Sequence, residues 1–168
     1  MSDSPSETPI FVRASELSDK EATSIIPIYC VRPDEWADVK SSLDDIGQSY
    51  ATARGFCADA GQRVRLPKPD GSVSAVLYGL GPVEDDDLGP IRVGGLSSAL
   101  PEGFYKLAVI PKDWKRALAE TGWGMGAYKF ETYLKDETRF PTLVVSEESP
   151  LVEIQSLADA TALCRDLI

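Results

Sequence analysis

The sequence contains no histidine among its 168 residues, and this absence removes a large set of catalytic mechanisms. Ser-His-Asp and Cys-His nucleophile activation, HExxH zinc sites and imidazole general bases all require that residue. Any catalysis by this chain would therefore rest on carboxylates, lysine, tyrosine or cysteine.

Basic charge is also scarce. Lys and Arg together number 17 against 27 Asp and Glu, which leaves a formal net charge of −10 at pH 7. A protein that binds nucleic acid needs basic side chains to neutralise the phosphates, whereas a chain with excess negative charge repels them. We therefore exclude a basic nucleic-acid binder and expect no nucleic acid as a partner.

Long apolar runs and a leader sequence are lacking as well. The longest strongly apolar run, residues 25–31, is interrupted by Pro27 and is far shorter than the roughly 20 residues of a membrane helix. Residues 1–9 have no basic flank and no apolar stretch, so they do not resemble a signal peptide. We expect a cytosolic protein with no membrane partner, and a mobile N-terminal tail at residues 1–9.

Cysteine is sparse: the chain has Cys30, Cys57 and Cys164. An odd number without metal-ligand spacing favours free thiols in a reducing compartment over a disulfide framework. We expect these thiols to be buried, because free cysteine is among the most buried residue types. A nucleophilic Cys57 or Cys164 would need an activating base, and no histidine can provide it.

The clearest local signal that is present is a β-hairpin. Residues 63–67 alternate in polarity, residues 69–72 have turn chemistry, and residues 73–78 are apolar and β-prone. Similar composition predicts further strands at residues 25–31, 104–110 and 141–145.

Helical spacing separates these strands. One helix face is predicted by Trp36, Val39, Leu43 and Ile46, which follow one another at spacings of three or four residues. A second helical stretch is expected over residues 50–56, stopped near Gly55, and a short helix within residues 88–100.

The second half of the chain predicts two longer helices. The first opens at residues 111–113, and its apolar positions are Trp114, Leu118, Met125, Tyr128 and Leu134. The second follows Ser149 and Pro150, and helical spacing is kept by Leu157, Ala160, Cys164, Leu167 and Ile168.

Alternation of strands and helices predicts an α/β layered fold, and the hairpin makes the sheet mixed rather than purely parallel. The composition, 43% hydrophobic and 26% charged, is that of an ordinary globular protein. A chain of this length buries roughly 70% of its unfolded surface. We find no internal repeat, and expect residues 10–168 to form a single domain.

Two glycine-rich segments are candidate binding loops. Gly79-Leu80-Gly81 follows a strand, as a phosphate loop would, but position 84 is Glu where a third glycine belongs. A plain strand-ending turn is therefore favoured. The segment with Gly122, Gly124 and Gly126 lies within a helical pattern, where each glycine costs roughly 1 kcal/mol against alanine. This predicts close packing or a helix break there, with packing favoured.

Acidic runs give no clear site. Residues 84–87 are four adjacent acids, which lack the spaced ligands and turn glycine of a calcium loop, and Glu147-Glu148 is a shorter run of the same kind. Both are interpreted as solvated surface charge. No pair of carboxylates has a spacing that singles it out for glycoside chemistry. We assign no catalytic, cofactor-binding or metal-binding residue.

The predicted last helix has Arg165 in its final turn but no glycine or asparagine stop, and the sequence finishes on Leu167 and Ile168. Two apolar side chains at an uncapped helix end lead us to expect that the chain has been cut at this point. The alternative is a surface helix whose last residues pack back onto the core.

The last third of the chain resembles the leucyl (cytosol) aminopeptidase family of two-metal peptidases. The resemblance rests on residues 123–130, WGMGAYKF, followed by Tyr133, Lys135, the strand at Pro141 and the helix ending RDLI at residues 165–168. In that family a Gly-Ala-Tyr-Arg/Lys-Phe stretch lies late in the N-terminal region. An Arg-Asp-Leu-hydrophobic segment there leads into Asn-Thr-Pro and the catalytic domain. Residues 77–81, LYGLG, also match a strand ending that is common in the family.

This resemblance implies a non-catalytic N-terminal domain. Such a domain is a mixed-sheet, three-layer α/β sandwich similar to macro domains, carries no metal ligand and contributes to the packing of a hexamer. Its partner is its own C-terminal catalytic domain, which binds two divalent metals, Mn or Zn, and removes N-terminal residues from peptides. The family's Asn-Thr-Asp-Ala-Glu-Gly-Arg-Leu motif is absent from this chain, so we transfer no catalytic or metal residue. The segment by itself is not expected to be an enzyme.

Two other hypotheses stay open at this stage. One is an autonomous macro-like domain that binds a nucleotide or ADP-ribose at the carboxyl ends of its strands. The other is a purely structural role in which Trp114, Trp123 and Tyr128 form an interface. Burial of these aromatics in the core is favoured over the interface, because they share a helical stripe.

Overall fold

The computed structural model describes residues 9–83, 89–127 and 141–166. The expected mobile tail therefore lies almost wholly outside the described residues, as do the acidic run at 84–87, Tyr128 and Leu134. The chain is an α/β fold with a mixed six-stranded sheet, which confirms the predicted class.

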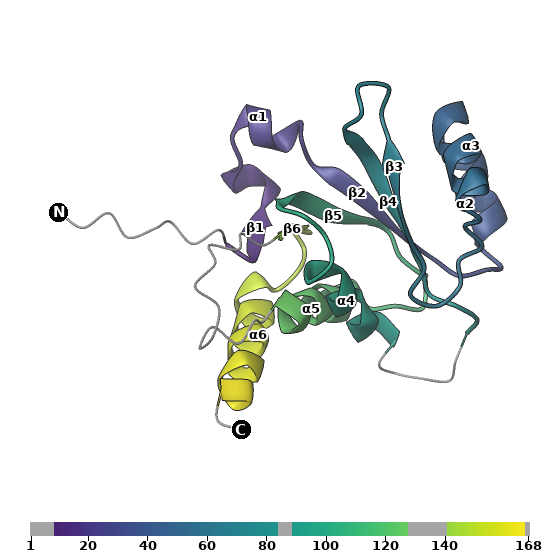
Figure 1. Ribbon diagram of the computed structural model, residues 1–168. Coiled ribbons are helices and arrows are strands. Elements are labelled where there is room, and N and C mark those ends of the chain that lie inside the picture. Colours follow the sequence, from purple (N-terminus) through teal and green to yellow (C-terminus); the bar gives the residue numbers. More distant parts are fainter. Residues whose placement is uncertain (1–8, 84–88, 128–140, 167–168) are drawn as a thin grey trace. The chain divides into compact units, whose positions relative to one another are not determined.

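The chain divides into two compact units, and each is described by itself (Figure 1). Unit 1 comprises residues 1–24, 88–104 and 115–168, and unit 2 comprises residues 25–87 and 105–114. The expectation of a single domain over residues 10–168 stays a prediction.

Unit 2 is built on four strands in the order β5-β2-β4-β3. They are β2 (Ile26–Val31), β3 (Arg63–Pro67), β4 (Val73–Gly79) and β5 (Gly103–Val109), of which residues 105–109 lie in unit 2. The β2 strand pairs in parallel with β4 and with β5, whereas β3 and β4 are antiparallel. The predicted hairpin and the strands at 25–31 and 104–110 are confirmed. Because β2, β4 and β5 are parallel, their carboxyl ends meet at one edge.

The segment from Trp36 to Ile46, which was predicted to share one helix face, belongs to two separate helices of unit 2. The α2 helix (Trp36–Ser42) ends where Leu43 becomes extended, and α3 (Asp45–Ala53) begins anew. The cause is Asp44, whose side chain accepts a hydrogen bond from the Gly47 backbone N–H at 2.8 Å and caps α3. The helical stretch expected over 50–56 is therefore the second half of α3, which stops before Gly55 (φ 63°).

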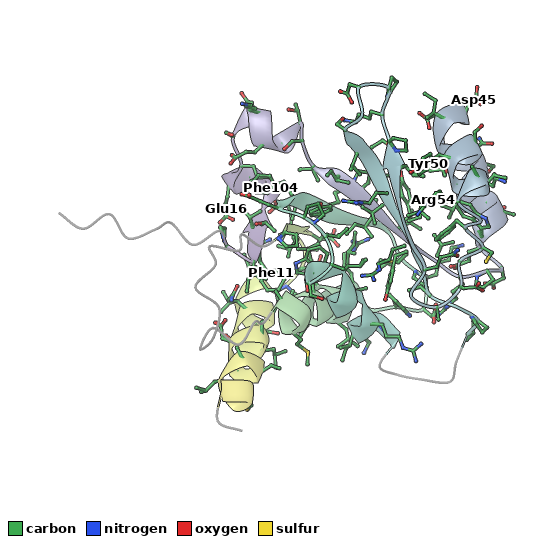
Figure 2. All side chains as sticks on the ribbon, viewed as in Figure 1. Phe11, Glu16, Asp45, Tyr50, Arg54 and Phe104 are labelled. Atoms are coloured by element: carbon green, nitrogen blue, oxygen red, sulfur yellow. The ribbon has the colours of Figure 1, made fainter. Side chains whose placement is uncertain are left out.

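The core of unit 2 lies between these helices and the hairpin. Trp36, Val39 and Leu43 pack against its buried residues, as their spacing predicted, while Ile46 is 44% exposed. The rings of Trp36 and Phe56 meet edge to face with centroids 4.7 Å apart. The buried members are Val31, Ala51, Phe56, Ala58, Val64, Leu66, Ala75 and Leu77. Figure 2 shows Asp45 and Tyr50 on α3 and Arg54 directly after its end.

Unit 1 contains a parallel pair of strands, β1 (Phe11–Arg13) and β6 (Pro141–Val145), with Phe11 opposite Leu143. The predicted strand at 141–145 is confirmed, and all five of its residues are buried. The sequence analysis did not predict β1, the 3-10 helix η1 (Ala14–Glu16) or α1 (Asp19–Ala22), which have only three or four residues each. The helix expected within 88–100 consists of the 3-10 helix η2 (Gly89–Val93) followed by α4 (Gly94–Ser97).

Two longer helices of unit 1, α5 (Arg116–Ala127) and α6 (Leu151–Asp166), pack side by side (Figure 1). The prediction that the first begins at 111 is wrong, because Trp114 and Leu118 close separate turns onto the carbonyls of Pro111 and Lys115. The predicted packing of its glycines is confirmed. A Cβ atom on Gly122 would lie 2.7 Å from Cα of Ile91, and one on Gly126 would overlap the backbone of Gly94.

The buried side of α6 is not the side on which the sequence placed its apolar stripe. Among the residues of α6 whose side chains the structure describes, Ile154 and Ala158 are buried, and a Cβ atom on Gly124 of α5 would lie 2.7 Å from Cβ of Ala158. Of the predicted stripe, Leu157, Ala160 and Cys164 are instead exposed, and Leu167 and Ile168 lie outside the described residues. Hydrophobic spacing alone misidentified the packing side because apolar residues lie around most of this helix.

Within the described ranges, no helix is both long enough and apolar enough to cross a membrane.

Candidate functional site

The carboxyl ends of β2 and β4 in unit 2 carry the segment Gly79-Leu80-Gly81. Gly79 cannot carry a side chain, because a Cβ atom there would overlap the backbone carbonyl of Asp59, and Gly81 has φ 74°. The loop at residues 58–62 is thus laid directly against the end of β4. Gly61 N–H donates to the Gly79 carbonyl at 2.9 Å and fixes the two segments together.

All three backbone N–H groups of this segment donate to carbonyls of the protein. Gly79 donates to Gln62 at 2.8 Å, Leu80 to Val31 at 2.9 Å and Gly81 to Ala58 at 2.9 Å. A phosphate-binding loop needs such groups pointing outward at its ligand. The segment therefore acts as the strand-ending turn favoured by the sequence, and it gives the nucleotide hypothesis no support.

An ion pair joins the carboxyl ends of β2 and β5 in the same unit. The Arg32 guanidinium donates to both carboxylate oxygens of Asp113, each at 2.7 Å, and the Arg32 side chain is only 14% exposed. Hydrogen bonding to Arg32 lowers the pKa of Asp113, and the same contact raises the pKa of Arg32. The sequence analysis missed this pair, because 81 positions separate its members.

Cys57 is exposed, contrary to the prediction of a buried thiol, and so is Cys164; the prediction is right only for Cys30. The Cys57 thiol donates to Oδ2 of Asp59 at 3.0 Å. That hydrogen bond raises the pKa of Cys57, since it holds the proton next to a carboxylate. A thiol kept protonated is a poor nucleophile, so this geometry does not support a catalytic role for Cys57.

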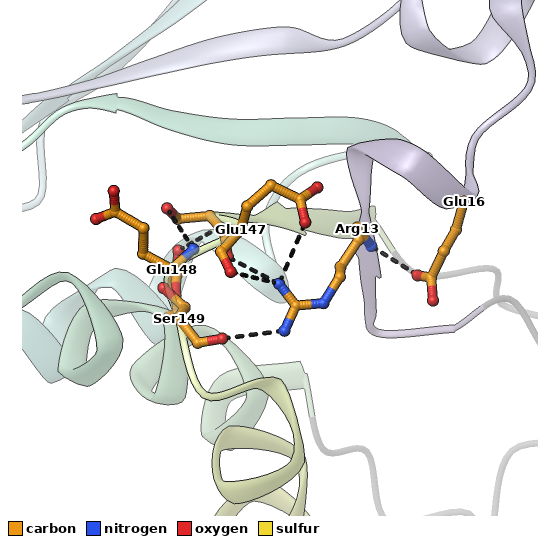
Figure 3. Close-up of polar contacts among 7 residues, drawn as sticks. Arg13, Glu16, Glu147, Glu148 and Ser149 are labelled. Atoms are coloured by element: carbon orange, nitrogen blue, oxygen red, sulfur yellow. Dashed lines mark hydrogen bonds and ion pairs between the residues drawn. The ribbon is translucent and has the colours of Figure 1, made fainter.

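In unit 1 the carboxyl ends of β1 and β6 meet around Arg13 (Figure 3). Its guanidinium donates to the backbone carbonyls of Ser146 at 3.3 Å, Glu147 at 3.0 Å and Ser149 at 3.1 Å. The Glu147 carboxylate also contacts it at 3.5 Å, so Glu147 forms a surface ion pair and is not simply solvated charge. The Arg13 side chain thereby ties the start of α6 to β1.

Glu120 of α5 holds the same loop from inside. It is 1% exposed, and its Oε1 accepts a hydrogen bond from the Ser146 backbone N–H at 3.1 Å. Its Oε2 has no hydrogen-bond partner among the described residues. The sequence offered one signal for this contact, which is that Glu120 is the single acidic residue in a helical segment rich in alanine and glycine. That signal was not recognised from the sequence.

The aromatic residues considered for an interface have different environments. Trp123 is fully buried within α5, which confirms the core interpretation for that residue, and Trp114 is partly exposed.

No group of three or more His, Cys, Asp and Glu side chains in the described parts of the chain is arranged to hold a metal ion. Partly buried arginines and close glycine contacts fix loops and helices, and these contacts form a structural scaffold within each unit.

Comparison with known proteins gives this scaffold a context. Residues 26–146 match the family model described as the N-terminal domain of M17 aminopeptidases. Among solved structures, the cytosol aminopeptidase of Coxiella burnetii is similar with 26% identity and a TM-score of 0.70. That match covers 94% of this chain and 33% of the C. burnetii protein. No curated protein sequence gave a match.

Two further structures have the same fold at lower identity. A tomato leucine aminopeptidase mutant is 15% identical with a TM-score of 0.58, covering 95% of this chain and 36% of its own. The bottromycin maturation enzyme BotP is 20% identical with a TM-score of 0.58, covering 86% of this chain and 32% of its own. The chain thus spans about a third of the length of the proteins that it matches.

Proposed function

Because the chain belongs to the family of M17 aminopeptidase N-terminal domains, we propose that it works as the scaffold third of a metallo-aminopeptidase whose reaction centre lies in another region. One observation carries this proposal. The family match covers residues 26–146, while the 94% of the chain that aligns with the C. burnetii enzyme covers only 33% of that enzyme.

The reaction we propose for the complete enzyme is removal of N-terminal residues from peptides. Two divalent metals, Mn or Zn, would be held in the catalytic region, where such ions activate water and polarise the scissile carbonyl. The described residues of this chain do not fit such ions, since they contain no group of three candidate ligands. We further propose a cytoplasmic enzyme that assembles as a hexamer.

The part played by this chain is packing and assembly. In unit 1, α5 contacts η2, α4 and α6, with glycines at the closest approaches. Arg13 and Glu120 hold the loop that leads into α6. A helix anchored in this way can present a fixed surface to a following domain.

The first test is an activity assay on the 168-residue protein. We expect no hydrolysis of leucyl-p-nitroanilide, with or without added Mn²⁺ or Zn²⁺, because the described residues offer no metal site and the sequence has no histidine base. Metal-dependent hydrolysis by the purified chain would contradict the proposal.

The second test is a fusion protein in which this chain replaces the matching N-terminal third of the C. burnetii cytosol aminopeptidase. We expect the fusion to hydrolyse leucyl-p-nitroanilide in the presence of Mn²⁺ and to sediment as a hexamer. The control is the same C. burnetii region with no N-terminal third. A fusion no more active than that control would contradict a supporting role for this chain.

A further inference from the structure

The exposed side of α6 is unusually apolar. Val152 is 80% exposed, Leu163 is 61% exposed and Leu157 is 55% exposed. These are three of the six large hydrophobic residues that the described structure leaves most exposed, and all three lie on one helix. Ala160 and Cys164 are exposed beside them.

These residues form one continuous surface. At about 100° per residue, Val152, Ala160, Leu163, Cys164 and Leu157 fall within an arc of roughly 140° around the helix axis. We call these five residues the outer face of α6. The arc also holds Ser156 and Glu153, of which only Glu153 is charged.

The buried residues of α6 lie on the other side. Ile154 and Ala158 are 2% and 5% exposed, and this side packs against α5. A surface helix of a globular protein has one apolar stripe, whereas a helix that is apolar on both sides is normally covered on both. The outer face therefore has the composition of a surface that a further protein element covers.

Charge argues against a second copy of this chain as the cover. Each copy has a net charge of −10, so two copies repel, and a symmetric contact would place the two Glu153 carboxylates on the same small interface. The fitting partner is an apolar surface with a basic side chain opposite Glu153.

Chain connectivity in the relatives points to one such partner. The family match is to an N-terminal domain, and 94% of this chain aligns with 33% of the C. burnetii enzyme. Because the matched domain is N-terminal in this family, we expect most of the rest of that enzyme to follow the segment that corresponds to α6. A domain tethered there is present at high effective concentration next to the outer face.

We propose that the outer face of α6 is the docking surface for the catalytic region of the aminopeptidase. This inference rests on the proposed function, and it adds which residues make the contact and what kind of surface they meet.

The test uses Cys164 as a reporter within the outer face and Cys57, in unit 2, as the reference thiol. Both are exposed and free. The 168-residue chain and the C. burnetii fusion are treated with N-ethylmaleimide, and modification of each cysteine is followed by peptide mass. We expect Cys164 to react roughly tenfold or more slowly in the fusion than in the chain alone, with Cys57 unchanged.

Equal reactivity of Cys164 in the two proteins overturns the proposal. So does protection of Cys164 in the 168-residue chain itself, because the face would then be covered without a catalytic region. If that protection depends on protein concentration, the cover is a second copy. This readout does not depend on activity. A fusion with protected Cys164 but no hydrolysis would count against the proposed function and leave the docking surface supported.

A variant pair supplies a second measurement. Leu163→Glu places a charge in the outer face, and Ile46→Glu places one at a similarly exposed apolar residue of α3. Neither should change the thermal midpoint of the 168-residue chain. In the fusion, Leu163→Glu should abolish protection of Cys164 and lower hydrolysis about tenfold, because a charge in an apolar interface is costly. Equal effects of the two substitutions in the fusion would reject the assignment.

Discussion

The glycine contact between α4 and α5 allows a sharp quantitative prediction for Gly126→Ala. From sequence alone, alanine should stabilise a helix interior by about 1 kcal/mol relative to glycine. The structure reverses that sign. A Cβ atom at position 126 would overlap the carbonyl group and Cα of Gly94, which are backbone atoms and cannot rotate away.

The expected loss follows from these two opposing effects. Inserting a methyl group into a packed region costs about 1–3 kcal/mol, and the upper end applies because helices rather than side chains must move apart. Subtracting the helix-propensity gain leaves a destabilisation of about 2 kcal/mol. For a protein of this length that corresponds to a fall in Tm of about 4–8 °C.

Urea unfolding followed by far-UV circular dichroism measures this change. The matched control is Gly47→Ala in α3, where a Cβ atom would lie 2.8 Å from Oδ1 of the Asp44 side chain, not from backbone, and 3.4 Å from the Leu66 side chain. We expect that variant to stay within about 1 kcal/mol of the wild type, since propensity and capping effects offset each other. A Gly126→Ala protein as stable as the wild type would refute the reasoning.

Three further predictions concern polar contacts. In Asp113→Asn, the pairing with Arg32 that lowers the pKa of Asp113 is lost. Its stabilisation is present above the unfolded pKa of about 3.9 and disappears as pH falls through the lower folded value, so the variant's deficit in urea midpoint at pH 7 should shrink as the pH is lowered below about 3.9 and vanish once Asp113 is fully protonated. A deficit that persists in acid contradicts this. Asp59→Ala should lower the pKa of Cys57 and speed its alkylation by iodoacetamide at about pH 8; an unchanged rate rejects the assigned hydrogen bond. Arg13→Ala should cost about 1–3 kcal/mol in urea unfolding and accelerate amide exchange at residues 146–149, whereas wild-type protection there would show that Arg13 does not hold the loop.

The sequence determined the secondary structure wherever a signal was local. The hairpin at residues 63–78 and the strands at 104–110 and 141–145 depend on alternation, β-branched residues and turn chemistry. The resemblance to aminopeptidases was likewise carried by residues close together in the chain, and the family match confirms it. Where two helices shared one apolar periodicity, as on either side of Asp44, the pattern could not locate the break.

Tertiary structure alone decided which faces are covered and which charges meet. Arg32 and Asp113, or Arg13 and Ser149, come together only because parallel strands bring their carboxyl ends to one edge. Sequence periodicity placed Leu157 and Cys164 on one stripe of α6, but it could not tell that Ile154 and Ala158 face α5. The physical reason is that spacing along a helix determines which residues share a side, whereas the neighbouring element determines which side is buried.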